Sequence, residues 1–335
     1  MDRLGRYWGA LISALQFHFE RFWREWIVAL VALLIVFVRG YVFLLAAPSG
    51  FPAGSIVTIS RGENAAQIAG ELRDAQIVKH PEVLRILLRF SGQAGSLRSG
   101  AYRFLHPQNA LVVAYRLATA DFGIEPAHIT FPEGTTARAM AARATNLLPQ
   151  IRAGDFLRAA EPYEGYLFPD TYTFAPDATA ESIVATLRAN FNAKMAELLP
   201  TIAKSGHSLS DIVIMASLVE REARTPQEKK IVAGILWNRI RVGMPLQVDA
   251  VFGYINGRDT YAPSLEDLSV DSPYNTYTHK GLPPGPIDNP GLDSLTAAAS
   301  PQKSSYLYYL TGKDGQMHYA ITFAEHKANR AQYLQ

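Results

Sequence analysis

Apolar residues are concentrated in one long run near the N-terminus. Residues 26–38 are all apolar, and after Arg39 the run resumes over residues 41–47. A helix rises about 1.5 Å per residue, so this stretch is long enough to cross a bilayer core of about 30 Å. No comparable run follows it. The pattern predicts one transmembrane helix over residues 26–47, with a globular body after it.

Basic residues are distributed unevenly around this span. Four arginines precede it, and the next basic residue after Arg39 is Arg61. Such a bias predicts a cytoplasmic N-terminus and an extracytoplasmic body. A cleaved signal peptide is the alternative, although the preceding segment is long and residues 45–47 make a poor cleavage site. The four arginines are Arg3, Arg6, Arg21 and Arg24.

Large apolar side chains also recur before the span, in residues 1–25. Their spacing and the tryptophans among them predict an amphipathic segment that lies on the cytoplasmic leaflet. The side chains concerned, with the first tryptophan of the span, are Trp8, Leu11, Ile12, Leu15, Phe19, Phe22, Trp23 and Trp26.

Residues 48–122 have the pattern of a small separate module. A linker with two prolines and two glycines precedes it. Alternation over residues 55–60 predicts a strand, and the apolar spacing that follows predicts two helices, the second starting at Pro81 and broken by Gly92 and Gly95. A second strand is expected over residues 100–104, and a joining helix over residues 109–119. Strand, helix, helix, strand is the architecture of a LysM-like module.

A faint repeat links this module to the chain that follows. Residues 58–62 align with residues 130–134, each a strand end and a glycine turn. The apolar positions of the next helix then align as well: Ala65, Ile68 and Ala69 with Ala137, Met140 and Ala141. Two interpretations stay open, a second copy of the unit or a chance likeness between two strand–turn–helix segments.

Residues 123–335 have the pattern of a larger mixed domain, so the predicted fold class of the whole chain is α+β. Residues 208–223 are apolar on all sides, which predicts a buried helix. Thr225, Pro226 and Glu228 are typical of a fresh helix start with a capping box. The other helices are expected over residues 180–199, from Thr225 to about Val242, and near residues 292–299 and 323–334.

Composition limits the chemistry. The chain has no cysteine, which excludes disulfides, cysteine-ligated zinc and thiol catalysis. Its net charge of +2 gives no sign of nucleic-acid binding. An apolar fraction of 48% over 335 residues can fill more than one core. The expected division is a cytoplasmic segment, a transmembrane helix, a LysM-like module and a larger domain: residues 1–25, 26–47, 48–122 and 123–335.

Two carboxyls end the predicted buried helix, Glu220 and Glu222. At about 100° per residue they point to nearly opposite faces, so they cannot face each other. Either would be partly desolvated, which raises the pKa of a carboxyl toward that of a useful general acid. The alternative is that Glu222 reaches solvent in the last turn and pairs with Arg221 or Arg224.

Two loops rich in aromatic, amide and proline residues follow, residues 273–277 and 281–287. Such loops suit a sugar, because rings stack on pyranose faces and amides bond hydroxyl and N-acetyl groups. Gln247 and Asp249 could line the same cleft. A purely structural loop, and a turn or capping role for Asp249, are the alternatives.

The sequence gives no sign of a metal or cofactor site. His279, His318 and His326 lack the tight spacing of metal-ligand motifs, so no metal is expected. A phosphate-binding loop, a dinucleotide fingerprint and a serine nucleophile elbow are also absent from the sequence, and no cofactor is expected.

Five motifs in order resemble one family, the YceG-like or MltG-type endolytic murein transglycosylases of bacteria. They are Glu164-Gly165 with Phe168-Pro169-Asp170-Thr171-Tyr172; Ala216-Ser217-Leu218-Val219-Glu220-Arg221-Glu222; Asn238-Arg239 with Gly243-Met244-Pro245-Leu246-Gln247 and Asp249; Tyr274-Asn275-Thr276-Tyr277; and Gly281-Leu282-Pro283-Pro284-Gly285-Pro286-Ile287. One departure is visible: Ala250-Val251 follow Asp249, at the end of an expected strand, where the family usually has Pro-Thr.

The resemblance implies a single-pass enzyme of the bacterial inner membrane with a periplasmic or extracytoplasmic body. It would cleave the β-1,4 bond between N-acetylmuramic acid and N-acetylglucosamine in peptidoglycan and leave 1,6-anhydromuramic ends. The catalytic glutamate corresponds to Glu222. Supporting or substrate-binding roles fall on Glu220, Ser217, Gln247, Asp249, Tyr274, Asn275 and Tyr277.

The family is linked to ending glycan-strand growth, so penicillin-binding proteins or other wall synthases are the implied protein partners. One carboxyl without a facing partner suits a lytic transglycosylase, because the sugar's own C6 hydroxyl replaces water as the nucleophile. A membrane-tethered peptidoglycan-binding scaffold without chemistry and a plain hydrolase are the alternatives.

Overall fold

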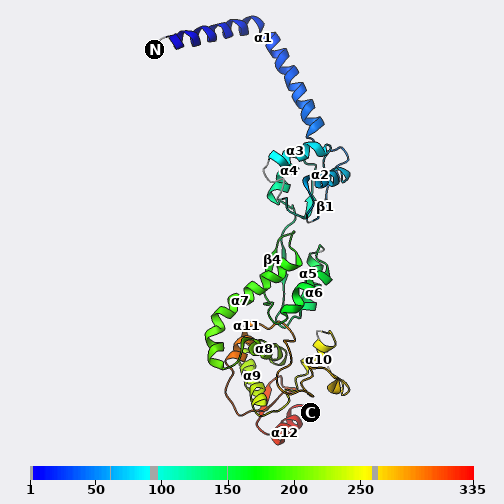
Figure 1. Cartoon of the computed structure of the whole chain (residues 1–335), viewed down its shortest axis with the longest axis vertical. Helices are drawn as coiled ribbons and strands as arrows, with labels where there is room; N and C mark the ends of the chain where they lie inside the picture. The colour runs from blue at the N-terminus through cyan, green and yellow to red at the C-terminus, as the bar shows by residue number, and fades with distance from the viewer. Residues whose placement is uncertain (1–2, 61, 91–96, 149, 259–262) are drawn as a thin grey trace. The chain divides into compact units, whose positions relative to one another are not determined.

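The computed structural model of the chain describes residues 3–60, 62–90, 97–148, 150–258 and 263–335. The chain divides into two compact units, Met1–Glu125 and Pro126–Gln335. The first unit has one cluster of buried hydrophobic residues, and the second unit has two. Figure 1 labels the elements of both.

The first unit begins with the long helix α1 (Arg3–Leu44), which is interrupted by non-helical backbone at Phe22. The part after the interruption, Phe22–Leu44, is apolar and long enough to cross a membrane, and none of it is buried by the protein. Membrane anchors and signal sequences share these properties. The expected apolar face of residues 1–25 rests largely on side chains, such as Leu11 and Phe19, that lie outside the described ones.

The rest of the first unit is a strand–helix–helix–strand module, as the sequence predicts. Strands β1 (Ser55–Ile59) and β2 (Gly100–Phe104) pair antiparallel, with Ser55 opposite Phe104. Between them lie α2 (Ala65–Asp74), which begins with a capping box of Asn64 and Gln67, and α3 (Pro81–Phe90). Because a two-stranded sheet is marginal alone, the module depends on its helices, including α4 (Ala110–Thr119), for a core. The breaks expected at Gly92 and Gly95 fall outside the described residues.

The second unit begins with the same order of elements. Strands β3 (Ala127–Thr130) and β4 (Thr171–Phe174) pair antiparallel and enclose α5 (Ala137–Leu147), α6 (Ala153–Ala160) and the 3-10 helix η1 (Glu161–Tyr163). Two of the three aligned helix positions are buried in both segments, Ile68 with Met140 and Ala69 with Ala141, whereas Ala65 is only partly buried. Four elements and the antiparallel pairing therefore agree, which favours the repeat interpretation.

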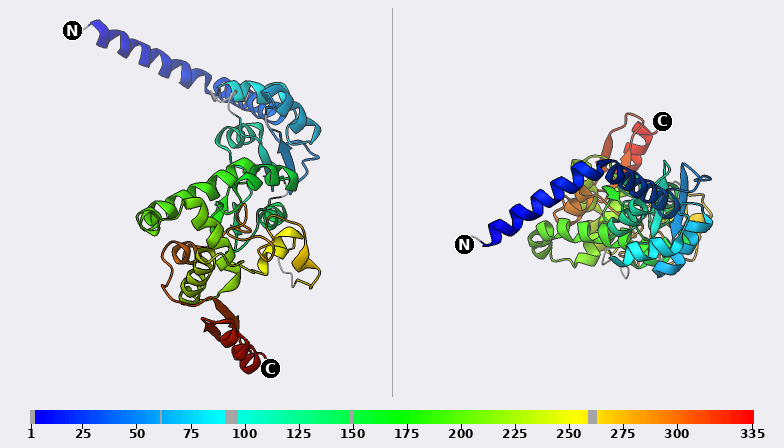
Figure 2. Two further views of the ribbon diagram at one scale, coloured as in Figure 1. Left: turned by 60° about the horizontal axis from the view of Figure 1, so that its bottom comes forward. Right: turned by 90° about the horizontal axis from the view of Figure 1, so that it is seen from above.

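Helix α7 (Ala180–Ser205) is longer than its sequence pattern predicts. The predicted helix ends at residue 199, yet the observed one continues through Pro200 to Gly206, whose left-handed backbone (φ 78°) caps it. Leu198 and Ile202, on either side of the proline, are both buried in the core, and this packing outweighs the lost backbone hydrogen bond. Figure 2 shows α7 in green as a long helix of the second unit.

The core of the second unit surrounds helix α8 (Leu209–Glu222). Helices α9 (Pro226–Arg241) and α11 (Leu292–Ala299) pack against α8 and against each other. Residues 212–219 of α8 are all buried, so the prediction of a helix buried on all sides is confirmed. The predicted capping box of Thr225 and Glu228 starts α9.

The last part of the unit holds several elements that the sequence analysis missed. The strand expected before Asp249 is instead an irregular segment with a left-handed residue, Gln247 (φ 52°), and it leads directly into the short helix α10 (Ala250–Ile255). A 3-10 helix, η2 (Asp267–Ser269), follows. Strands β5 (Tyr308–Thr311) and β6 (Met317–Ala320) form a hairpin before α12 (Phe323–Tyr333), the last predicted helix.

Candidate active site

The two glutamates at the end of α8 point to different surroundings, as their spacing predicts. Ser208 and Asp211 form a capping box that fixes the start of the helix, and extended backbone at Ala223 (φ −137°, ψ 147°) ends it directly after Glu222. Glu222 is therefore held at the very end of a buried element. Its position is set by packing rather than by a loop.

The Glu222 carboxyl lies in a partly buried site beside the C-terminal hairpin. Its Oε2 accepts a hydrogen bond of 2.9 Å from the Tyr309 hydroxyl of β5. Burial raises the pKa of Glu222 to about 7, and the charge of Asp249 adds to the rise, whereas the Tyr309 hydrogen bond and the Arg239 charge oppose it. A carboxyl with this pKa can give and accept a proton near neutral pH.

This arrangement differs from the alternative in which Glu222 pairs with a neighbouring arginine in solvent. The Arg221 side chain is directed elsewhere: its Nη1 donates to the Gly134 carbonyl at 3.4 Å, and its Nε lies 3.9 Å from the buried carboxyl of Asp288. Glu222 is thus paired with a tyrosine from a distant part of the chain.

Asp249 and Tyr277 belong to the same group as Glu222. The Tyr277 hydroxyl donates a hydrogen bond of 2.5 Å to Asp249 Oδ1. Burial raises the pKa of Tyr277, and the charge of Glu222 adds to that rise. Arg239 supports the group from α9. Its Nε donates to the Leu307 carbonyl and its Nη1 to the Leu246 carbonyl, both at 2.7 Å, which ties the hairpin to the segment that precedes Asp249.

Glu220 is bound on every side by the protein. Its Oε1 pairs with Lys229 Nζ at 2.9 Å, and its Oε2 accepts from Gly291 N at 3.0 Å and Ser294 Oγ at 2.6 Å. These bonds join α8 to α9 and to the first turn of α11. Glu220 therefore occupies a supporting position, one of the two roles that the sequence left open for it.

Two of the expected site residues are turned into the protein. Ser217 is fully buried; its hydroxyl donates to the Ile214 carbonyl and accepts from Ile287 N. Asn275 is also fully buried. Its amide donates to the carbonyls of Leu268 and Val270 and accepts from Tyr277 N. The amide of Asn275 therefore holds the loop together, and a substrate-binding role for this residue stays a prediction.

Gln247 and Tyr274 have different neighbours. Gln247 is exposed, and its Oε1 lies 3.5 Å from Arg239 Nη1. Tyr274 packs its ring against Tyr254 of α10, with 5.0 Å between ring centroids. Hydrogen bonds and charge interactions thus link Gln247, Asp249 and Tyr277 to Arg239 and Glu222, whereas the ring of Tyr274 contacts α10.

Sequence reasoning missed Arg239 and Tyr309 as members of the site. Arg239 stands inside one of the quoted motifs, and its place there is the signal that could have found it, because a buried arginine can bind several carbonyls with its fork of donors. Tyr309 belongs to a tyrosine-rich segment, residues 306–309, that has no helical or strand spacing to single it out. Among the described residues, no group of three or more histidine or acidic side chains is arranged to hold a metal.

Comparison with known proteins gives a consistent result. The YceG-like family matches residues 57–332. A Bacillus subtilis protein named endolytic murein transglycosylase is 28% identical over 305 residues, which cover 83% of this chain and 84% of that protein. A Streptococcus pneumoniae protein of the same name is 28% identical over 320 residues, and the match covers 83% of this chain but 58% of that longer protein. A crystal structure of a YceG-like protein from Listeria monocytogenes matches with a TM-score of 0.57 and 28% identity, over 82% of this chain and 99% of that one.

Fold and site together define an α+β protein in which one partly buried carboxyl is set for acid–base chemistry. The chain belongs to the YceG-like family.

Proposed function

We propose that the chain is an endolytic lytic transglycosylase. It cleaves the β-1,4 bond between N-acetylmuramic acid and N-acetylglucosamine in peptidoglycan and leaves 1,6-anhydromuramic ends. The observation that carries the proposal is Glu222, held at the end of α8, bonded to Tyr309 and with a pKa raised to about 7. The names of the relatives from Bacillus subtilis and Streptococcus pneumoniae support the substrate class.

The chemistry needs one group that gives a proton and then accepts one. Protonated Glu222 donates its proton to the glycosidic oxygen as the bond from that oxygen to C1 of N-acetylmuramic acid breaks. The resulting carboxylate then accepts the proton of the C6 hydroxyl of the same sugar, while the oxygen of that hydroxyl bonds to C1. No water is consumed, and Glu222 ends as it began. Because the nucleophile belongs to the substrate, its effective concentration is high without a positioned water.

The neighbouring residues divide into two kinds. Asp249, Tyr277 and Gln247 lie on the side of Glu222 and contact the substrate in this proposal. Their charge and hydroxyl groups stabilise the positive charge that develops at C1. Ser217, Glu220 and Asn275 act through the backbone and helices that they hold. They position the site without touching the sugar.

A plain hydrolase is the second candidate, and one observation favours it. Asp249 is close enough to Glu222 for its charge to raise the pKa of that carboxyl. Two neighbouring carboxyls are what a glycoside hydrolase uses, one as acid and one as base or nucleophile. Cleavage in water labelled with heavy oxygen separates the two reactions: a hydrolase incorporates the label into its product ends and a lytic transglycosylase does not.

We further propose that residues 22–44 anchor the protein in the bacterial inner membrane. Arginines before the span and their scarcity after it support a cytoplasmic N-terminus and an extracytoplasmic body. Peptidoglycan lies on that side of the membrane, so the proposed orientation places Glu222 where its substrate is. The segment before Phe22 lies on the inner leaflet in this arrangement.

The module of β1, α2, α3 and β2 is proposed to be LysM-like and to hold the glycan or position the second unit. The proposed physiological role is to end the growth of nascent strands beside wall synthases such as penicillin-binding proteins. A membrane-tethered scaffold that binds peptidoglycan without cleaving it is the alternative role, and it predicts binding to sacculi with no new chain ends.

The deciding test is product analysis of the full-length protein in detergent. The protein is incubated with nascent and with mature peptidoglycan, and the chain ends are determined by mass spectrometry. The wild type is expected to give 1,6-anhydromuramic ends, and Glu222→Gln is expected to give none, because the amide cannot donate the proton.

The matched control is Glu197→Gln, at an exposed glutamate on α7 of the same unit, and it is expected to cleave like the wild type. An active Glu222→Gln protein with a normal circular dichroism spectrum would overturn the assignment of the acid. Absence of cleavage by the wild type on both substrates would favour the scaffold.

A further inference from the structure

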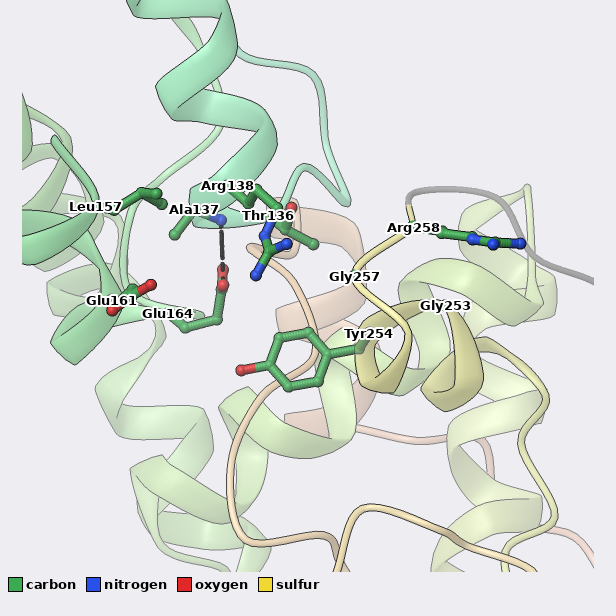
Figure 3. Close-up of a pocket in the computed structure, with 10 residues that line it drawn as sticks. All are labelled: Thr136, Ala137, Arg138, Leu157, Glu161, Glu164, Gly253, Tyr254, Gly257 and Arg258. Carbon is green, nitrogen blue, oxygen red and sulfur yellow. Dashed lines mark hydrogen bonds between the residues drawn. The ribbon is translucent and has the colours of Figure 1, made fainter. Parts of the chain in front are cut away.

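A cavity of about 420 Å³ lies in the second unit on the α5 side of α10. Figure 3 shows the side chains of Arg138, Glu164 and Tyr254 converging on it from three elements. Thr136, Glu161 and Arg258 are the other polar residues of the lining. Nothing in the proposed cleavage reaction uses this cavity.

The cavity presents both signs of charge. Glu161 and Glu164 come from η1 and the turn after it, whereas Arg138 comes from α5 and Arg258 follows α10. Figure 3 shows the guanidinium of Arg138 pointing into the space between Glu164 and Tyr254. Among the described residues, that guanidinium has no ion-pair partner. A cavity with this lining suits a ligand that carries an ammonium group and a carboxylate together.

The carboxyl of Glu164 is held in place by the fold. Glu164 accepts from Ala137 N at 3.0 Å and from Asn289 Nδ2 at 2.7 Å, which fixes its carboxyl at the start of α5. Burial raises the pKa of Glu164 to about 7, so an incoming cation favours its charged form. Arg138 Nη1 lies 2.8 Å from the place where a β-carbon on Gly257 would stand, so the guanidinium passes close to the backbone that follows α10.

Helix α10 connects the cavity to the site around Glu222. Asp249 directly precedes the helix on the side of Glu222, and Tyr254 lies in its last turn beside the cavity. At about 1.5 Å per residue, the axial distance between these two positions is only about 8 Å. Asp249 and the cavity therefore lie at the two ends of one short helix.

On the basis of the proposed function, we propose that this cavity binds the zwitterionic end of the short peptide carried by the N-acetylmuramic acid residue at the cleaved bond. Such peptides bear free carboxylates and, where they contain a diamino acid, a free amine. Arg138 binds a carboxylate, and Glu161 and Glu164 bind the ammonium group. The enzyme thereby recognises the peptide as well as the glycan.

Binding is measured by calorimetry on full-length Glu222→Gln protein in detergent, so that no cleavage interferes. The probe is N-acetylmuramyl-L-alanyl-D-glutamyl-diaminopimelate. It is expected to bind about tenfold more tightly than the same compound acetylated on the free amine, and Arg138→Ala is expected to weaken it by about tenfold. Arg143→Ala, at an exposed arginine on α5 outside the cavity, is the control and leaves the affinity unchanged. Equal affinity for the free and acetylated probes, or full affinity in Arg138→Ala, would overturn the inference.

A second measurement compares cleavage of strands with intact peptides and of strands from which an amidase has removed them. The ratio of the two rates is expected to favour intact strands by about tenfold for the wild type and for Arg143→Ala, and to fall toward one for Arg138→Ala. A ratio near one for the wild type would overturn this inference and leave the proposed function standing. Tight binding of the probe by a protein that cleaves neither strand would overturn the proposed function alone.

Discussion

The hydroxyl of Tyr309 donates a hydrogen bond of 2.9 Å to Oε2 of Glu222, although 87 positions separate the two residues in the chain. The bond joins the end of a buried helix to a hairpin that Arg239 holds through the Leu307 carbonyl. It stabilises the charged carboxylate, whereas burial favours the neutral acid, and the balance leaves the pKa of Glu222 at about 7.

Tyr309→Phe is expected to move the alkaline limb of the pH–rate profile upward. The hydroxyl lowers the pKa of Glu222, so its removal raises that pKa, by roughly 0.5 to 1 unit for one hydrogen bond. An acid that must be protonated to act then stays active to a higher pH. The measurement is kcat/KM against pH for the full-length protein on peptidoglycan.

Tyr308→Phe is the matched control, because Tyr308 is the preceding residue and stacks instead on His326. Its profile is expected to follow the wild type. If the alkaline limb of the Tyr309→Phe profile falls at the same pH as in the wild type, whatever the overall rate, then Tyr309 does not set the pKa of Glu222.

Lys229→Met is expected to destabilise the second unit by about 3 to 5 kcal/mol, because it leaves the Glu220 carboxylate buried without its cation. The two side chains are 5% and 8% exposed, so water cannot replace the partner. Urea denaturation followed by circular dichroism measures the loss. The double variant Lys229→Met with Glu220→Gln is expected to recover a large part of it, and a double variant as unstable as the single one would contradict the coupling.

A comparison of alanine substitutions at Gly165 and Gly281 distinguishes the cost of backbone strain from the cost of steric crowding. Both have left-handed backbone, with φ of 84° and 85°. A β-carbon on Gly165 would collide with Pro286 and stand 2.8 Å from Val213 Cγ1, whereas one on Gly281 has open space.

Gly281→Ala is therefore expected to cost about 1 to 2 kcal/mol from strain alone, and Gly165→Ala a further 1 to 3 kcal/mol from overpacking. Thermal and urea unfolding of both variants give the comparison. Equal losses would mean that the loop of residues 281–287 shifts freely away from Gly165.

The sequence predicts the elements of this site where one local signal is strong. Residues 212–219 are apolar except for Ser217, a pattern that predicts burial, and the capping residues Thr225 and Glu228 mark the next helix start. The opposite directions of Glu220 and Glu222 follow from helix geometry alone.

The parts that escaped prediction depend on contacts between distant residues. An amide in a loop has the same appearance in a sequence whether it faces a ligand or, like Asn275, the carbonyls of Leu268 and Val270. Pro200 predicts a helix end, and only the burial of Ile202 explains why α7 continues. Tyr309 has no local feature that links it to Glu222.

The pairing of Glu222 with Tyr309 also makes the surroundings of the Glu222 carboxyl depend on a finished chain. Ribosomes make the protein from its N-terminus, so α8 is translated before the hairpin that carries Tyr309. A copy that stops short of residue 309, or loses its tail to a protease, retains the glutamate without its tyrosine. In such a copy the pKa of Glu222 is set without the hydrogen bond that lowers it in the complete protein.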